Sequence, residues 1–200
     1  MFSLNKHLEI SVEDDLYIID NFYQEPNKIV NFFNKQKSYL HKENQKGFNG
    51  TLFEDRRFSA WIDDIIPVYN FLSELIKQSP LHTAVCTNKW RGIKNSFNDY
   101  KNNYWWPHID RGYTGIVYLN RDDTSNGTNL YNVLEDNTKG VCEHKHPWQN
   151  KNNYNIIKTI TPIFNRMVLF DGLCYHGMNI CNDRYFDLEY RLNQVFFFKK

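Results

Sequence analysis

A pattern typical of metal binding occurs in the second half of the chain, where a histidine and an aspartate stand two positions apart. They are His108 and Asp110, in the segment WWPHID at 105–110. Side chains two positions apart on a β-strand leave the same face, so we expect this imidazole and carboxylate to point into a common space. A second histidine, His176, follows in the segment FDGLCYHG at 170–177 and can join them from another strand. Two imidazoles and one carboxylate form the facial triad that holds Fe(II) in non-haem oxygenases, with open positions for a co-substrate and O₂.

The His-x-Asp pair also has a simpler interpretation, because a histidine and an aspartate on the surface give the same short pattern by chance. The segments that follow it favour the metal site. They are a strand-like segment containing Tyr118, a turn and strand at 126–131 (NGTNLY), a strand at 165–170 that leads to His176, and a strand at 191–196 that opens with Arg191. As an ordered set these motifs are specific.

This ordered set, over residues 97 to 198, resembles the Fe(II)/2-oxoglutarate-dependent oxygenase superfamily in its prolyl 4-hydroxylase-like branch. In the first half, IIDNF at 18–22, PN at 26–27 and FNG at 48–50 resemble a small group of such proteins found in bacteria and phages. The resemblance implies an α+β, mainly β fold, with a double-stranded β-helix (jelly-roll, cupin-like) core and supporting helices in the N-terminal part. It also implies a dioxygenase that hydroxylates a peptidyl or small-molecule substrate and decarboxylates 2-oxoglutarate to succinate.

The resemblance also carries roles onto particular residues. The implied Fe(II) ligands are His108, Asp110 and His176. In this family a basic residue on the strand after the second histidine binds the far carboxylate of 2-oxoglutarate. Arg191 fits that place, since a guanidinium binds a carboxylate through two parallel hydrogen bonds. Its spacing from His176 is wider than is usual in the family, so Arg184 is a competing candidate. We prefer Arg191 because the position requires a strand, and 192–198 has strand character. With this choice, 179–187 is expected to be a lengthened loop.

Two tyrosines are candidates for a further contact with the same carboxylate. Tyr118 matches a position where prolyl hydroxylase-like enzymes place a tyrosine hydroxyl, and Tyr100, upstream of His108, is a second candidate of this kind. The competing interpretation of both is aromatic packing in the core, because the chain has 13 tyrosines. Asp110 favours hydroxylation, since halogenating relatives have a small residue in its place.

Two other functions stay open at this point. A jelly-roll module that binds a metal or ligand without turnover would keep the same residues. A metal-dependent hydrolase on a cupin-like barrel would need a general base beside the metal, for which Asp171 and Glu143 are the candidates. The sequence CEHKH offers Cys142, His144 and His146 as ligands of a second metal. Zinc sites need four ligands with paired spacing, so we prefer a polar loop over the mouth of the site.

The elements that must position these residues follow from hydrophobic periodicity. An apolar run at 16–19 predicts a strand. Apolar residues at helical spacing predict a helix from about 26 to 38 and a second one at 62–76 that stops near Pro80. Further strands are expected at 83–91, 97–100, 112–119, 155–160, 166–170 and 192–198. We therefore expect one domain over 1–200, with a helical and strand support region at 1–96 and a jelly-roll catalytic core at 97–200.

Length and composition exclude several classes of protein. The 200 residues carry 24 basic and 23 acidic side chains, a balance that gives no general attraction to nucleic acid. No apolar run approaches the roughly 20 residues of a membrane helix, and the first ten residues lack the apolar centre of a signal peptide. Four cysteines without a CxxC pair indicate reduced thiols. We expect a cytoplasmic protein, of a bacterium or a phage-infected host cell, whose partner is a small-molecule or peptide substrate; its oligomeric state stays open.

Overall fold

The computed structural model describes residues 1–36, 39–40, 47–48, 51–58, 63–92, 100–134, 148–186 and 189–199. This part of the chain is mainly β, with two antiparallel sheets of the β-sandwich type and few helices. The mainly β class expected from the sequence is therefore confirmed. Among the described residues, no helix combines the length and the apolar character that a membrane span requires.

The larger sheet contains strands from both halves of the chain. Over the described residues its order is β1 (Glu9–Glu13), β2 (Leu16–Asp20), β12 (Met167–Asp171), β8 (Tyr113–Tyr118), β14 (Arg191–Phe198), β6 (Pro80–Gly92), β5 (Thr51–Phe58) and β3 (Tyr39–Leu40), with β4 (Gly47–Phe48) also paired to β5. β2 pairs with β12, and β6 pairs with β14, in both cases antiparallel. The segments 1–96 and 97–200 are thus joined by main-chain hydrogen bonds within one sheet.

The smaller sheet carries the segments that the sequence marks for chemistry. Its order is β10 (Trp148–Asn150), β7 (Asn103–His108), β13 (Tyr175–Met178), β9 (Thr128–Val133) and β11 (Tyr154–Ile160). An apolar layer, which we call the inter-sheet core, lies between the two sheets. Its buried members are Leu16, Ile116, Tyr118, Leu130, Ile160, Val168 and Phe170.

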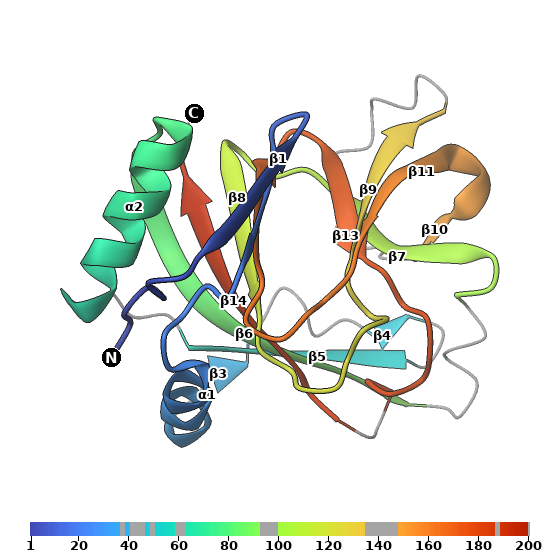
Figure 1. Cartoon of the computed structure of the whole chain (residues 1–200). Coiled ribbons are helices and arrows are strands. Elements are labelled where there is room, and N and C mark those ends of the chain that lie inside the picture. The colour runs from blue at the N-terminus through green and yellow to red at the C-terminus, as the bar shows by residue number, and fades with distance from the viewer. Residues whose placement is uncertain are drawn as a thin grey trace.

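Two helices cover the face of the larger sheet that points away from the inter-sheet core. In α1 (Pro26–Lys35) the proline occupies the first turn, where it loses no helical hydrogen bond, and Ile29 and Phe33 are buried one turn apart. α2 (Ile66–Ile76), preceded by the 3₁₀ turn η2 (Asp63–Ile65), buries Val68, Tyr69, Leu72 and Ile76. These side chains form one core with residues of β8, β12 and β14. In Figure 1, α2 lies beside β14 and β8, on the side away from β13 and β9.

Most of the predicted elements are confirmed, with strand ends within three residues of those expected. The first helix ends at Lys35, and 37–38 lie outside the described residues. The strand predicted at 97–100 is wrong at Tyr100, which lies in a turn, and 97–99 lie outside the described residues. β1 and β5 were not expected. Both carry charged residues, and each pairs antiparallel with a strand that was expected, β1 with β2 and β5 with β6.

Asn165 ties the N-terminal segment to the larger sheet. Its side-chain oxygen accepts from the main-chain N–H of Tyr23 at 2.8 Å, and its amide donates to the carbonyl of Tyr23 at 2.9 Å. The residue is 7% exposed and has φ 66°, a left-handed conformation that asparagine tolerates better than most residues.

We expect Asn165→Ala to lower the free energy of unfolding by about 3 kcal/mol, because it leaves a buried main-chain N–H and C=O without partners and puts alanine in a left-handed conformation. Urea unfolding would measure this. Asn155→Ala, at an exposed position of β11, is the control and should change stability by less than about 0.5 kcal/mol. Equal effects of the two substitutions would contradict the proposed role of Asn165.

Candidate functional site

The two histidines meet across neighbouring strands. β7 and β13 are antiparallel, and His176 lies directly opposite His108 in their register. The two ring centroids are 4.4 Å apart. His176 is only 3% exposed and packs edge-on against Phe170 at 4.9 Å, whereas His108 is half-buried. The strand pairing therefore brings together two imidazoles that are far apart in the sequence.

Asp110 joins them by a route that the sequence did not predict. β7 ends at His108, so the alternation of side chains along a strand does not place the aspartate. Its main-chain N–H donates to the carbonyl of Gly172 at 2.8 Å, which docks the chain beyond β7 onto the turn after β12. Its carboxylate accepts a hydrogen bond from Thr114 Oγ1 at 2.9 Å and lies 3.3 Å from Nε2 of His176.

The three side chains form a compact group of potential metal ligands. One ligand atom from each of His108, Asp110 and His176 lies within 4.8 Å of the others. Nδ1 of His108 lies 2.8 Å from the carbonyl of Trp106, and Nδ1 of His176 lies 2.9 Å from the carbonyl of Cys174. Because a carbonyl only accepts, both Nδ1 atoms must carry the proton. In the neutral rings each Nε2 then keeps its lone pair, which is the tautomer that metal-ligating histidines adopt when their other nitrogen is held by a carbonyl.

The electrostatics of the group favour an ionised carboxylate. Burial alone would raise the pKa of Asp110. When His176 and His108 also carry a proton on Nε2, the hydrogen bond from His176, the positive charges of the two rings and the bond from the Thr114 hydroxyl together outweigh that effect and lower the pKa of Asp110 below its ordinary value. The group thus presents a carboxylate and two imidazole nitrogens, a donor set suited to a divalent transition metal.

A β-bulge aims His108 at this group. Between the pairs His176–His108 and Met178–Trp105, β7 has one residue more than β13. Trp106 takes up the extra length with φ 49°, an unusual conformation for an aromatic residue that costs of order 1–3 kcal/mol. The bulge turns the Trp106 carbonyl toward the ring of His108. Bulges of this kind are common beside active sites, where they re-aim a side chain.

Two glycines make room for this geometry. A Cβ on Gly177 would lie 2.8 Å from the carbonyl oxygen of Trp105 and 3.1 Å from that of Trp106, at the bulge. A Cβ on Gly172 would lie 2.6 Å from the carbonyl oxygen of Gly112 and 2.9 Å from Cβ of Asp110. Main-chain atoms cannot give way as a flexible side chain can, so either position requires glycine.

We expect Gly172→Ala to weaken metal binding by roughly 10- to 100-fold although every ligand is intact, because the new methyl group displaces Asp110. Isothermal titration with a divalent metal would measure the change. Gly115→Ala is the control: its methyl group collides with the side chain of Met167 in the helix-covered core, so it disturbs packing without touching a ligand. If both variants bind metal equally well, Gly172 does not position Asp110.

Arg191 and Tyr118 lie close together and away from water. Arg191 begins β14 and is 8% exposed. Its Nε donates to the carbonyl of Asn126 at 3.3 Å and its Nη2 to that of Gly127 at 3.2 Å. The guanidinium carbon lies 5.9 Å from the ring centre of Tyr118, whose hydroxyl donates to Thr128 Oγ1 at 2.7 Å. Burial raises the pKa of Tyr118, although the charge of Arg191 and the bond to Thr128 oppose the rise.

The register of β9 relates this pair to the histidines. Leu130 lies opposite His176, and Thr128 stands two residues before Leu130 on the same strand, so the side chains of Leu130 and Thr128 leave the same face. Leu130 belongs to the inter-sheet core, as does Tyr118. Arg191, Tyr118 and the group of His108, Asp110 and His176 therefore border the same space between the sheets.

Arg184 and Tyr100 have different surroundings. Arg184 is 25% exposed and binds Glu189 at 2.8 Å through its guanidinium. Tyr100 donates to Asn179 Oδ1 at 3.1 Å and packs with the cluster around Trp105, while the Lys151 ammonium lies 4.2 Å from the centre of its ring. Burial raises the pKa of Tyr100 to about 12.

Several candidates lie elsewhere or beyond the described part of the chain. Cys142, Glu143, His144 and His146 fall within 135–147, outside the described residues. Asp171, the other candidate base, ends β12, and its Oδ1 accepts from the main-chain N–H of Leu173 at 3.0 Å.

The sequence reasoning overlooked the residues that support the ligands. Trp106, Thr114, Gly172 and Gly177 support the three potential ligands, and Thr128 supports Tyr118. The glycines carried a signal, since a glycine beside a proposed ligand indicates close approach of another main chain. The two threonines carried none, because a threonine on a strand is ordinary.

Comparison with known proteins gives a likeness of fold. No family model matches the sequence, and no curated protein matches it. In all, 27 chains of solved structures match the fold. One is described as the X-ray structure of E. coli ycfD: it has a TM-score of 0.50 and 10% sequence identity, and the match covers 97% of this chain and 55% of that one. The chain thus spans about half the length of that structure, and at this level of identity the likeness concerns the fold alone.

Proposed function

We propose that this protein is an Fe(II)- and 2-oxoglutarate-dependent dioxygenase that hydroxylates a peptidyl or small-molecule substrate. One observation carries the proposal: His108, Asp110 and His176 converge within 4.8 Å, with both Nδ1 atoms held by carbonyls and both Nε2 atoms left as ligands. Two imidazoles and a carboxylate, with no thiolate among the three, are the facial triad that suits non-haem Fe(II). The ligand set fits that metal.

The order of the strands supports the double-stranded β-helix that this class of enzyme would have. The row β6-β14-β8-β12 of the larger sheet faces the row β7-β13-β9-β11 of the smaller one. From β6 to β9, and again from β11 to β14, each successive strand moves to the other sheet. Winding of this kind produces a jelly-roll, and it would put the ends of β7, β8, β13 and β14 around one site.

Arg191 would bind the carboxylate of 2-oxoglutarate that is remote from the metal. It lies in the same inter-sheet space, and the carbonyls of Asn126 and Gly127 orient its guanidinium. The Tyr118 hydroxyl would add a neutral hydrogen bond beside it. A guanidinium is well suited to a carboxylate because it can donate two parallel, charge-assisted hydrogen bonds to it.

The division of labour follows from these contacts. When bound, the iron and 2-oxoglutarate supply the activation of O₂ and the oxidising power for hydroxylation. The chain's own residues hold the Nε2 and carboxylate ligands in place through Trp106, Cys174 and Thr114, orient the co-substrate through Arg191, and keep water from the buried face of His176.

Anaerobic titration of the wild-type protein tests the proposal. Adding Fe(II) and then 2-oxoglutarate should produce a visible charge-transfer band that saturates at one equivalent of each. Zn(II) with 2-oxoglutarate should give no band. 2-Oxobutyrate, which lacks the remote carboxylate, should bind far more weakly than 2-oxoglutarate. A protein that binds neither Fe(II) nor 2-oxoglutarate would rule the proposal out, and a bound metal without any affinity for 2-oxoglutarate would favour a metal-dependent hydrolase.

A further inference from the structure

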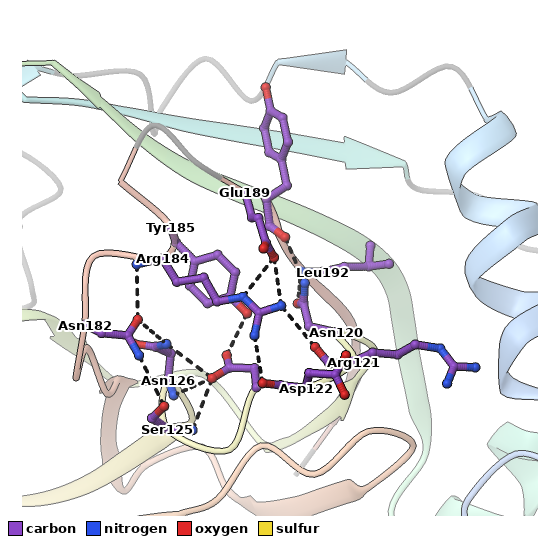
Figure 2. A network of polar contacts seen from close by, with 12 residues as sticks. Asn120, Arg121, Asp122, Ser125, Asn126, Asn182, Arg184, Tyr185, Glu189 and Leu192 are labelled. Atoms are coloured by element: carbon purple, nitrogen blue, oxygen red, sulfur yellow. Dashed lines mark hydrogen bonds and ion pairs between the residues drawn. The ribbon is translucent and has the colours of Figure 1, made fainter.

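The two connections that flank Arg191 are joined by a network of polar contacts. One is the β8–β9 connection at 119–127, and the other is the β13–β14 connection at 179–190, of which 187–188 lie outside the described residues. Figure 2 shows Ser125 and Asn126 of the first beside Asn182 of the second, and the side chain of Arg184 directed at the carbonyls of Arg121 and Asp122. Asn126 donates to Asn182 Oδ1 at 2.9 Å and accepts from the main-chain N–H of Cys181 at 3.0 Å.

Asp123 is the charged centre of this network. It is 4% exposed. One carboxylate oxygen accepts from the main-chain N–H of Ser125 and of Asn126, each at 3.1 Å, and from the side-chain amide of Asn126 at 3.2 Å. The other accepts from the hydroxyl of Tyr185 at 2.6 Å, the length of a strong charge-assisted hydrogen bond. Every contact of this carboxylate thus holds one of the two connections in place.

The turn that Asp123 holds is the one that faces Arg191. The N–H of Asn126 donates to Asp123, while the carbonyl of the same residue accepts from Nε of Arg191. The next carbonyl, of Gly127, accepts from Nη2 of Arg191 and from the main-chain N–H of Asn179. A Cβ on Gly127 would collide with the carbonyl of Ile160, so the turn also lies tightly against β11.

Asn120 holds the main chain next to Arg191. Its side-chain oxygen accepts from the N–H of Leu192 at 2.6 Å, and its amide donates to the carbonyl of Tyr190 at 2.9 Å. The main chain is therefore fixed on both sides of Arg191, and its side chain is fixed by the turn at 125–127. This arrangement explains how a long connection after His176 can still deliver one arginine to the inter-sheet space.

We propose that Asp123 is a positioning residue for Arg191: by holding the turn at 125–127, its carboxylate sets the orientation of the guanidinium and thereby the affinity for a dicarboxylate co-substrate. This inference rests on the proposed function for the co-substrate and on the contacts above for the arginine. Asp123 acts through the carbonyls of Asn126 and Gly127. It should therefore affect co-substrate binding and leave the metal ligands unchanged.

Three variants test this role. Asp123→Ala removes all four acceptor contacts. Asp123→Asn keeps one oxygen for the three N–H donors, and its amide can donate to the Tyr185 hydroxyl, so it should restore the turn. Asp122→Asn is the matched control, because it removes an exposed carboxylate from the neighbouring position, and asparagine tolerates the φ of 58° there.

The first readout is the anaerobic titration, in which the affinity for 2-oxoglutarate is compared with the affinity for Fe(II). We expect Asp123→Ala to raise the Kd for 2-oxoglutarate about tenfold and to leave the Kd for Fe(II) within twofold, since one held turn is lost and no ligand is moved. The Kd of Asp123→Asn for 2-oxoglutarate should stay within about threefold of the wild-type value, and the Kd of Asp122→Asn should equal the wild-type value. Circular dichroism at the same temperature shows whether each variant is folded.

The second readout needs neither iron nor 2-oxoglutarate. The Nε–H proton of Arg191 gives an NMR resonance that can be assigned by its loss in Arg191→Lys. This proton should exchange slowly with solvent in the wild type and in Asp122→Asn, and at least tenfold faster in Asp123→Ala. Unchanged exchange, or equal 2-oxoglutarate affinities in Asp123→Ala and Asp122→Asn, would overturn the positioning role. If the wild type binds no 2-oxoglutarate, the proposed function fails, and the exchange rates alone then decide whether Asp123 positions Arg191.

Discussion

His176→Ala is expected to weaken Fe(II) binding by more than about a hundredfold and to abolish the charge-transfer band with 2-oxoglutarate. Loss of an outer-shell partner already costs 10- to 100-fold in metal affinity, and this substitution removes an atom that we propose as a ligand itself. His176 faces both other members of the group, with Nε2 at 3.3 Å from Asp110 and its ring centroid 4.4 Å from that of His108. Anaerobic titration with Fe(II), followed by 2-oxoglutarate, measures both losses.

The control is His7→Ala, which removes an exposed histidine from the N-terminal segment and should bind Fe(II) like the wild type. Because His176 is buried against Phe170, its loss also leaves a cavity. His176→Gln fills more of that space and so separates the loss of packing from the loss of a ligand. It should be more stable than the alanine variant and still lack the wild-type affinity for Fe(II). Wild-type Fe(II) binding by either variant would contradict the assignment of His176 as a ligand.

Arg191→Met is expected to raise the Kd for 2-oxoglutarate about a hundredfold or more, whereas Arg184→Met should change it less than threefold. Removing one partner of a buried, hydrogen-bonded charge pair costs about 2–5 kcal/mol, and each 1.4 kcal/mol is a factor of ten. Arg191 is buried beside Tyr118, while Arg184 is a quarter exposed and binds Glu189. The pair of variants makes the same chemical change at the two candidate positions.

The measurement is the 2-oxoglutarate titration of the Fe(II)-loaded variants, with 2-oxobutyrate as the second ligand. Because 2-oxobutyrate has no remote carboxylate, its Kd should be nearly the same in the wild type and in Arg191→Met. This comparison separates a lost carboxylate contact from a general disturbance of the site. A large effect of Arg184→Met with none from Arg191→Met would reverse the assignment.

The contrast between the two arginines shows where sequence reasoning reached its limit. Both lie after His176, and the wide spacing of Arg191 made Arg184 a serious competitor. The strand character of 192–198 favoured Arg191, and the structure places it at the start of β14 with its side chain buried. What the sequence could not indicate is how Asp123 and Asn120 join the two connections, because their contacts with Tyr185, Tyr190 and Leu192 link segments that are distant along the chain.

Asp110 shows the same limit in a different way. The sequence placed it near His108 by assuming that one strand carries both. β7 ends at His108, and the aspartate reaches the group through its hydrogen bond to the carbonyl of Gly172 and through Thr114. The residue was predicted, and the reason was wrong, since a main-chain bond to another turn has no signature in a three-residue pattern.

The amino-acid sequence by itself determined which residues can carry the chemistry and most of the strands that present them. Ligand chemistry depends on residue type, and strands with one buried face leave an alternation that can be read locally. The tertiary structure decided which of these groups meet. The pairing of β7 with β13 set the two histidines opposite each other, and the bulge at Trp106 aimed one of them. Such contacts form between segments remote in sequence, and their geometry depends on the packing of two whole sheets.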